Sequence, residues 1–201
     1  DRESSVLGEK AMVGMYRYQG GRERVYLPDR PETFFYAQEL SASTEMVALL
    51  GCRVLSGSLE EVAAADNRII LTETMARKLF GRIDVCGESV CHIQKWRQLL
   101  YTVGAVVEDC RGKSNLYYDF ISPLWVEDYE RNSAVHENFR IMVRTSRPER
   151  TESELSRVDI KDSYPMGKLV LTPLRMFHKM GDGSGFVRAY FYQLAFVAVS
   201  L

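Results

Sequence analysis

Several sequence signatures of catalysis and metal binding are missing from this chain of 201 residues. Its four cysteines form no C-x-x-C pair, its three histidines form no H-x-x-x-H or H-E-x-x-H pattern, and no G-x-S-x-G sequence occurs. These absences argue against a zinc site of ordinary spacing, thioredoxin-like redox chemistry and an α/β-hydrolase nucleophile. A metal site built from residues distant in the sequence stays open, although the isolated His92 is expected to face solvent on a strand.

An excess of charge of one sign is also missing. The formal net charge is −1, so there is no electrostatic basis for binding nucleic acid or an anionic membrane surface. Hydrophobic residues make up 46% of the chain, which predicts a folded core in one large domain or two small subdomains. The opening "DRESSVLGEK" has no hydrophobic stretch and therefore no signal peptide, so we expect a cytosolic protein or a piece of a longer one.

A phosphate-binding loop is absent as well. In "RIILTETMARKLFGRIDVCGESV" (residues 68–90), Gly81 and Gly87 are one residue too far apart for a P-loop, and Glu88 follows in place of the lysine. We interpret these glycines as a helix stop and a turn, "GDGSG" (residues 181–185) as a linker, and the acidic Glu108 and Asp109 as a solvated strand end. The sequence therefore predicts no catalytic, cofactor-binding or metal-binding residues, no cofactor, and no ATPase activity for the isolated chain.

What the sequence does contain is a series of short strands and a few short helices, which predicts the α+β class with mixed sheets. Strands are expected at residues 33–40, 68–71, 115–125, 138–145 and 168–174, and a strand or extended loop at residues 52–57. Hairpins are expected at residues 11–28, around Gly20-Gly21, and at residues 88–109. Helices are expected at residues 44–51, capped by Ser43, and from Pro148 onward.

The helix with the most consistent local signals lies at residues 72–81. Thr72 is a suitable N-cap, and Glu73 places an anion in the first turn, where the helix dipole favours it. Met75 begins an apolar face at helical spacing, and Gly81 supplies the residue that ends the helix.

The second hairpin suggests a disulfide. A turn near residues 96–98 would place Cys86 opposite Cys110, within reach of a disulfide bond. The same register puts Cys91 on one face, expected to be the core, with Ile93, Val103 and Val107. Four buried free thiols remain the alternative, so the state of Cys52 and of the other three cysteines is open.

The end of the sequence is its most apolar part. Residues 189–201 are apolar apart from Gln193 and Ser200, with Tyr190 and Tyr192 near the start and Arg188 before them. Aromatic rings and a preceding arginine are typical of a membrane interface. We therefore expect an extracytoplasmic domain at residues 1–185 and the start of a transmembrane helix at residues 186–201. A C-terminal helix packed in the core is the alternative.

The order of motifs carries a resemblance. The stretches "LLGCRVLSG", "NRIILTETMARKLFG", "DVCGESV" and "YTVGAVVEDCRGKS", which span roughly residues 45–113, resemble the MacB-like periplasmic core domain of FtsX/MacB-type ABC-transporter permeases, particularly Bacteroidales-like ones. The sequence departs from that pattern at Ser58, where the family usually has arginine, and at Glu88, where it usually has lysine. Ala105 occupies the usual glycine position, and Gly104 comes one residue early.

This resemblance implies a fold of two small subdomains and a membrane protein around them. One transmembrane helix would precede the domain and three would follow, in the inner membrane, with the domain in the periplasm. ATP would be hydrolysed by a separate ABC ATPase subunit or domain, so this chain would not be an enzyme. It would couple membrane-helix movement to export or to a periplasmic partner, as a homodimer in the intact transporter.

A different class of function stays open beside that one. The alternative is a stand-alone soluble ligand-binding or enzymatic domain with a compact pocket of converging polar groups. The sequence does not specify the transported substrate, the periplasmic partner, or the oligomeric state of the isolated domain.

Overall fold

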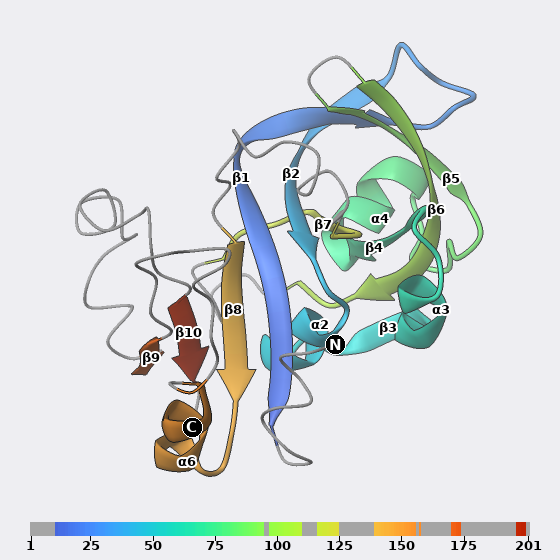
Figure 1. Ribbon diagram of the computed structural model, residues 1–201. Coiled ribbons are helices and arrows are strands. Elements are labelled where there is room, and N and C mark those ends of the chain that lie inside the picture. The colour runs from blue at the N-terminus through green and yellow to red at the C-terminus, as the bar shows by residue number, and fades with distance from the viewer. Residues whose placement is uncertain are drawn as a thin grey trace. The chain divides into compact units, whose positions relative to one another are not determined.

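The computed structural model describes residues 11–94, 97–109, 116–124, 139–155, 157, 170–173 and 196–199. The chain divides into two compact units, one formed by Asp1–Met15 with Asn132–Leu201 and the other by Tyr16–Arg131. The expectation of two small subdomains is therefore confirmed. Both units contain short helices and strands, so the predicted α+β class is also confirmed (Figure 1).

The strands and helices of the larger unit follow β1 (Met12–Tyr26), which begins in the smaller unit. They are β2 (Phe34–Ala42), α2 (Glu45–Leu49), β3 (Val54–Gly57), α3 (Leu59–Ala63), β4 (Arg68–Thr72), α4 (Glu73–Phe80), β5 (Ser89–Gln94), β6 (Arg97–Val107) and β7 (Phe120–Ser122). The described elements of the smaller unit are β8 (Phe139–Arg144), α6 (Pro148–Leu155), β9 (Val170–Pro173) and β10 (Phe196–Val199).

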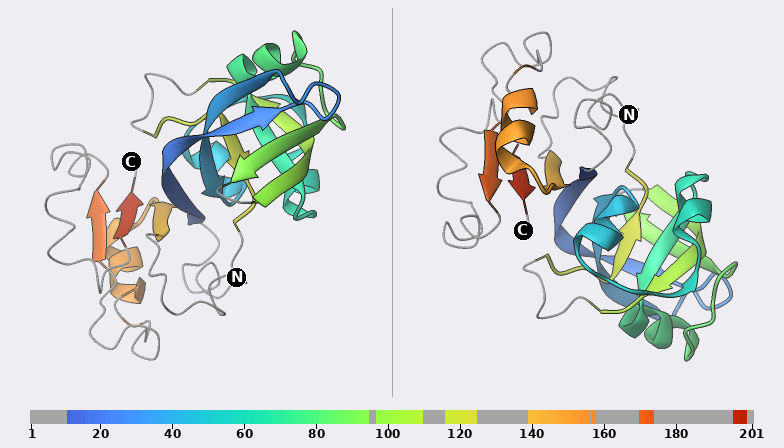
Figure 2. Two further views of the ribbon diagram at one scale, coloured as in Figure 1. Left: turned by 90° about the horizontal axis from the view of Figure 1, so that it is seen from above. Right: turned by 90° about the horizontal axis from the view of Figure 1, so that it is seen from below.

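Six strands of the larger unit form a closed ring. Their order is β2-β7-β4-β6-β5-β1, and β1 pairs back onto β2, which closes the sheet into a small barrel (Figure 2). The β2–β7 and β4–β6 pairs are parallel, and the other four pairs are antiparallel. The short strand β3 extends the sheet by pairing with the second half of β6. Closure leaves these six strands without a free edge between them.

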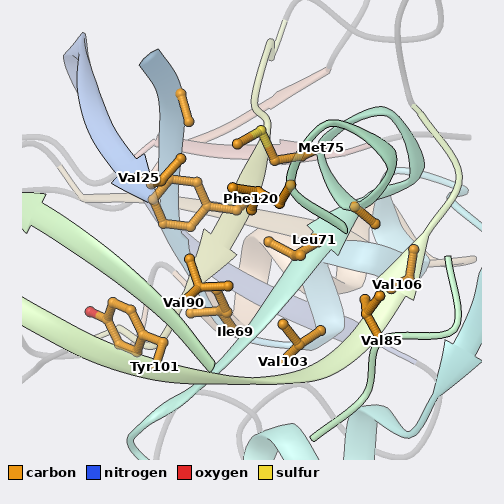
Figure 3. Close-up of a cluster of buried hydrophobic side chains, with 13 residues drawn as sticks. Val25, Ile69, Leu71, Met75, Val85, Val90, Tyr101, Val103, Val106 and Phe120 are labelled. Atoms are coloured by element: carbon orange, nitrogen blue, oxygen red, sulfur yellow. The ribbon is translucent and has the colours of Figure 1, made fainter. Parts of the chain in front are cut away.

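The inside of the barrel is the hydrophobic core. Every barrel strand contributes to it, and so does α4. Val25, Ala37, Ile69, Val90, Val103 and Phe120 are each no more than 2% exposed. Figure 3 shows Met75 of α4 beside the Phe120 ring, with Leu71 of β4 next to them. Substituting alanine for a buried phenylalanine such as Phe120 typically costs about 3–5 kcal/mol.

Helix α4 forms as its local sequence predicts. The Thr72 side chain accepts a hydrogen bond from the Met75 backbone N–H at 3.3 Å, and Gly81 adopts the left-handed conformation at the C-terminus. Asp109 adds a second cap, because its Oδ2 accepts hydrogen bonds from the Thr74 backbone N–H (3.1 Å) and hydroxyl (2.7 Å). Asp109 was expected at a solvated strand end, and it instead joins the end of β6 to the start of α4.

The hairpin predicted around Gly20-Gly21 is wrong. Residues 12–26 form one strand, and its pairing with β2 shifts register between Tyr18 and Arg22. Adjacent glycines suit a hairpin turn and a bulge in a continuous strand equally well. Pairing with β2 on both sides of the irregularity selects the bulge.

The register of the second hairpin also differs from the expected one. Gln94 lies opposite Arg97, so the connection is tighter than a turn at residues 96–98 allows. Cys91 consequently lies opposite Leu100, which is 60% exposed, whereas its neighbour Val90 belongs to the core. The assignment of Cys91 to the same face as Val103 is therefore wrong, because a register change by an odd number of residues exchanges the two faces.

Two short helices complete the larger unit. α2 forms where expected, but its N-cap is Thr44 rather than Ser43, and no side-chain hydrogen bond caps it. α3 was not predicted. Ser58 starts it by accepting a hydrogen bond from the Glu61 backbone N–H at 3.3 Å.

In the smaller unit, β10 pairs in parallel with both β8 and β9. The expected strands at residues 138–145 and 168–174 and the expected helix from Pro148 are present. Phe196–Val199 is a strand here, not the helix that the apolar sequence suggests. Among the described residues no helix is long and apolar enough to cross a membrane. The "GDGSG" linker and the rest of residues 186–201 lie outside the described residues.

Candidate functional site inside the barrel

The candidate site is a group of polar side chains on the inner face of the barrel, centred on Glu23, Glu39 and His92 (the Glu–His cluster). Each one continues a row of core residues along its strand. Glu23 is two residues before Val25 on β1, and His92 is two residues after Val90 on β5. Because side chains alternate along a strand, these residues share the inward face. The barrel interior is therefore apolar over most of its length and polar in one region.

His92 and Glu23 form the first part of the cluster. His92 Nε2 lies 2.5 Å from Glu23 Oε2, and the imidazole is fully buried. The imidazole ring lies where the cluster meets the hydrophobic core. Its centroid is 5.0 Å from that of the Phe120 ring and 6.1 Å from that of the Tyr101 ring. The expectation that His92 faces solvent is thus wrong, because the shifted hairpin register turns its side chain inward.

Glu39 anchors the second part of the cluster, and its carboxylate is almost completely buried. Its Oε1 accepts a hydrogen bond from the Ser122 hydroxyl at 2.5 Å, and its Oε2 accepts one from the Gln94 amide at 3.1 Å. The Ser41 hydroxyl lies 3.1 Å from that of Ser122. These bonds connect β2, β5 and β7 from the inside. Such donors offset the cost of burying a carboxylate, which is high when the group has no partner.

The cluster does not fit a metal ion well, although its three possible ligand atoms lie within 4.8 Å of one another. A histidine bound to metal through Nε2 carries its proton on Nδ1 and almost always donates it to an acceptor. His92 Nδ1 is buried and has no hydrogen-bond partner in the described part of the chain. The neutral ring with its proton on Nε2, donated to Glu23, leaves only a lone pair unpaired and matches the geometry better.

Access also limits what the cluster can do chemically. His92 is 0% exposed and the Glu23 side chain is 18% exposed, so a substrate would not reach the imidazole. General acid–base catalysis needs the group within hydrogen-bond reach of a bound substrate. The arrangement instead joins four strands, β1, β2, β5 and β7, through buried polar contacts. Sequence analysis missed this cluster because its residues come from four distant segments.

A second group of buried hydrogen bonds centres on Asp119, the residue before β7, and also reaches β2. The Asp119 side chain accepts a hydrogen bond from the Gln38 backbone N–H at 2.9 Å. The Asp119 carbonyl accepts two more at 3.0 Å, from the Thr72 backbone N–H and hydroxyl. Asp119 thereby ties β2 and β7 to the N-terminus of α4.

The cysteines differ from the expected pairing. Cys86 is an exposed free thiol and Cys91 a buried free thiol, so the predicted disulfide between Cys86 and Cys110 is wrong, as is the alternative of four free thiols. Cys52 is disulfide-bonded, and Cys110 lies outside the described residues. The Cys52 Sγ lies 3.3 Å from the Tyr118 hydroxyl. Burial, and then the negative charge of Asp109, raise the pKa of Tyr118 to about 12.

No family model and no curated protein matches the sequence. Solved structures do match. One is a domain of a protein described as a permease, from Porphyromonas gingivalis, with a TM-score of 0.58 and 19% identity over 76% of this chain and 66% of that one. Another is the extracellular domain of the noncanonic ABC-type transporter YknZ from Gram-positive bacteria, with a TM-score of 0.53 and 13% identity over 81% of this chain and 82% of that one.

The periplasmic region of MacB from Actinobacillus actinomycetemcomitans also matches, with a TM-score of 0.42 and 14% identity over 60% of this chain and 52% of that one. The first two likenesses show that this chain shares its fold with a domain of a protein described as a permease and with the extracellular domain of an ABC-type transporter. The resemblance found in the sequence is therefore confirmed for the fold.

Proposed function

We propose that this chain is the extracytoplasmic domain of an ABC-transporter permease subunit. The observation that carries the proposal is the shared fold with a domain of a protein described as a permease and with the extracellular domain of an ABC-type transporter. The intact protein would lie in the inner membrane, with this domain in the periplasm.

In this proposal the domain transmits movement and performs no chemistry. An ABC ATPase subunit or domain would hydrolyse ATP in the cytoplasm, and two permease copies would form a homodimer. The domain would pass movement of the membrane helices to an exported substrate or to a periplasmic protein. Such coupling requires two arrangements of the domain that differ in affinity for that ligand or partner. The inaccessible Glu–His cluster is consistent with a scaffold role and needs no metal or cofactor.

The test uses the full-length gene product expressed with an ABC ATPase from the same genome and purified in lipid nanodiscs. We expect the two to purify together and to hydrolyse ATP, while the isolated 201-residue chain neither binds nor hydrolyses it. Amide hydrogen exchange in residues 16–131 should differ between the nucleotide-free complex and a complex trapped with ATP by a hydrolysis-deficient ATPase variant. The deficient ATPase without nucleotide serves as the matched control.

The proposal would be contradicted if the ATPase failed to purify with the gene product or if the isolated chain hydrolysed ATP. It would also be contradicted if amide hydrogen exchange in this domain were the same in both nucleotide states. Tight binding of a small molecule by the isolated chain would favour the stand-alone ligand-binding alternative instead.

A further inference from the structure

The outer surface of the barrel carries two neighbouring arginines, Arg22 and Arg24, beside exposed aromatic rings. Both lie on β1 and alternate with the inward-facing Glu23 and the core residue Val25, so they point outward. Pairing of β1 with β2 sets Arg24 opposite Tyr36. We call the surface formed by Arg22, Arg24, Phe34, Tyr36 and Leu100 the Arg22/Arg24 face.

Strand pairing makes this face continuous across the barrel wall. One row runs from Tyr36 through Arg24 to Ile93, and the next runs from Phe34 through Tyr26 and Cys91 to Leu100. Within these rows Phe34 is 42%, Tyr36 59% and Leu100 60% exposed. With Met12, these three are the exposed large hydrophobic residues of the described part of the chain.

The two guanidinium groups differ from those of five other arginines of this unit. Neither Arg22 nor Arg24 forms an ion pair with any described residue. Each guanidinium lies over an aromatic ring instead, Arg22 at 5.9 Å from the Tyr117 centroid and Arg24 at 5.5 Å from the Phe34 centroid. By contrast, five other arginines of the unit each pair with a carboxylate, namely Arg30, Arg53, Arg68, Arg77 and Arg82.

Stacking on an aromatic ring holds each of these arginines in a restricted conformation before a ligand binds. A ring under the guanidinium restricts the side chain while leaving its five N–H donors directed to the edge. The Phe34 and Tyr36 rings are themselves held edge to face, with centroids 5.6 Å apart and planes at 89°. Arginine and tyrosine are the residue types enriched at the energetic centres of protein interfaces. The face therefore combines aromatic rings that are held in place by their neighbours with two positive charges that form no ion pair with a described residue.

We propose that the Arg22/Arg24 face binds another protein through a segment that carries carboxylates. Aspartate or glutamate side chains of that partner would accept paired hydrogen bonds from the two guanidiniums, and its apolar side chains would cover Phe34, Tyr36 and Leu100. Charge complementarity specifies the partner, because the positive charges on this face pair with no carboxylate among the residues that the structure describes. The proposal depends on this geometry alone and does not require the transporter role.

Other occupants fit the face less well. Membrane surfaces of anionic lipid are recognised by clusters of about 4–8 lysines and arginines, and this face offers two. A second copy bound through the same face would bring four arginines into one interface, where like charges repel. Nucleic acid is disfavoured by the formal net charge of −1 for the whole chain.

The proposal is tested with the 201-residue chain and a fluorescein-labelled peptide of alternating glutamate and leucine, followed by fluorescence anisotropy. We expect binding that weakens as salt is added, and loss of about tenfold or more in affinity for the double variant Arg22→Glu, Arg24→Glu. The lysine variant Arg24→Lys should show a smaller loss, because it keeps the charge but not the planar stack. The charge-matched comparison is Arg24→Glu against Arg53→Glu, which makes the same single reversal of charge at a side chain that is 76% exposed and away from the face.

The possible results distinguish a protein partner from a lipid surface and from a second copy of the chain. Circular dichroism first verifies that each variant is folded, which we expect because both arginines are exposed. The proposal is overturned if the glutamate peptide fails to bind at millimolar concentration, if a matched glutamine peptide binds equally well, or if Arg53→Glu weakens binding as much as Arg24→Glu. Equal or tighter binding to phosphatidylglycerol vesicles would assign the face to lipid. A dimer that is lost in Tyr36→Ser would assign it to a second copy.

Discussion

Replacing Gly57 with alanine should destabilise the larger unit more than any other single-methyl change at its turns. Gly57 has φ +83°, and a Cβ built there would lie 2.1 Å from the Gly104 carbonyl oxygen and 2.8 Å from the Ala105 Cα. Both contacts are with backbone atoms of β6, which pairs with β3 at this point. A backbone contact that short cannot be relieved by turning a side chain, so the two strands must separate.

The magnitude follows from two contributions. An L-residue in the left-handed region costs about 1–2 kcal/mol. Separating the strands weakens local hydrogen bonds, including the one from the Ser58 backbone N–H to the Gly104 carbonyl at 3.3 Å, at about 0.5–1.5 kcal/mol each. We expect a total loss of about 3–4 kcal/mol in the free energy of unfolding, which corresponds to a fall in Tm of roughly 10 °C.

Gly51→Ala is the matched control. Gly51 has φ +70°, and a Cβ there would meet nothing within 4 Å. The Gly51→Ala variant should lose only the free energy that an L-residue costs in the left-handed conformation, about 1–2 kcal/mol, and its Tm should fall by a few degrees. Thermal and urea unfolding followed by circular dichroism would compare the two variants. Equal losses for Gly57→Ala and Gly51→Ala would refute the argument from the close approach of β3 and β6.

Three further predictions concern buried groups. Ser122→Ala removes a donor to the buried Glu39 carboxylate and should lower the free energy of unfolding by about 1.5–3 kcal/mol in urea titrations. Tyr118 has a pKa raised to about 12, above its unfolded value near 10, so its stabilising contribution is complete below pH 10 and should be lost as pH rises through 12. Iodoacetamide should alkylate Cys86 in the folded, unreduced protein, and Cys52 only after reduction and unfolding, as mass spectrometry would show.

Each of these predictions has its own control. Ser56→Ala removes an exposed hydroxyl and should change stability by less than about 0.5 kcal/mol, so an equal effect at Ser122 would contradict the role of the buried carboxylate. Tyr118→Phe should flatten the alkaline pH dependence, and an unchanged profile would assign that dependence to other groups. Alkylation of Cys52 without reduction would show that it is not bonded.

Local signals predicted α4 because they all act within one helical turn. Thr72 caps the N-terminus and Gly81 ends the helix, and neither depends on the rest of the fold. The strands β2, β3 and β4 were also predicted, since each is a short apolar run between turn residues. For these elements the local sequence specifies both the secondary structure and the residues at which it ends, and the structure agrees with it.

Features set by strand pairing were predicted poorly. Gly20-Gly21 permits a turn or a bulge, and only the partner strand β2 selects between them. The β5–β6 register decides whether His92 or Cys91 faces the core, and the sequence of one hairpin does not specify it. The Glu–His cluster depends on that same register, and the Arg22/Arg24 face depends on the pairing of β1 with β2 and β5, so neither could be found before the pairing was known.

The most direct test of the proposed function uses the exposed thiol of Cys86. In intact cells with a permeabilised outer membrane, a maleimide that cannot cross the inner membrane should label the full-length protein at Cys86 without lysis, because the domain would lie in the periplasm. The Cys86→Ser variant should lose the label at this position, as mass spectrometry of the labelled peptides would show. Labelling of Cys86 only after the inner membrane is lysed would place the domain in the cytoplasm and contradict its assignment as an extracytoplasmic domain of an ABC-transporter permease.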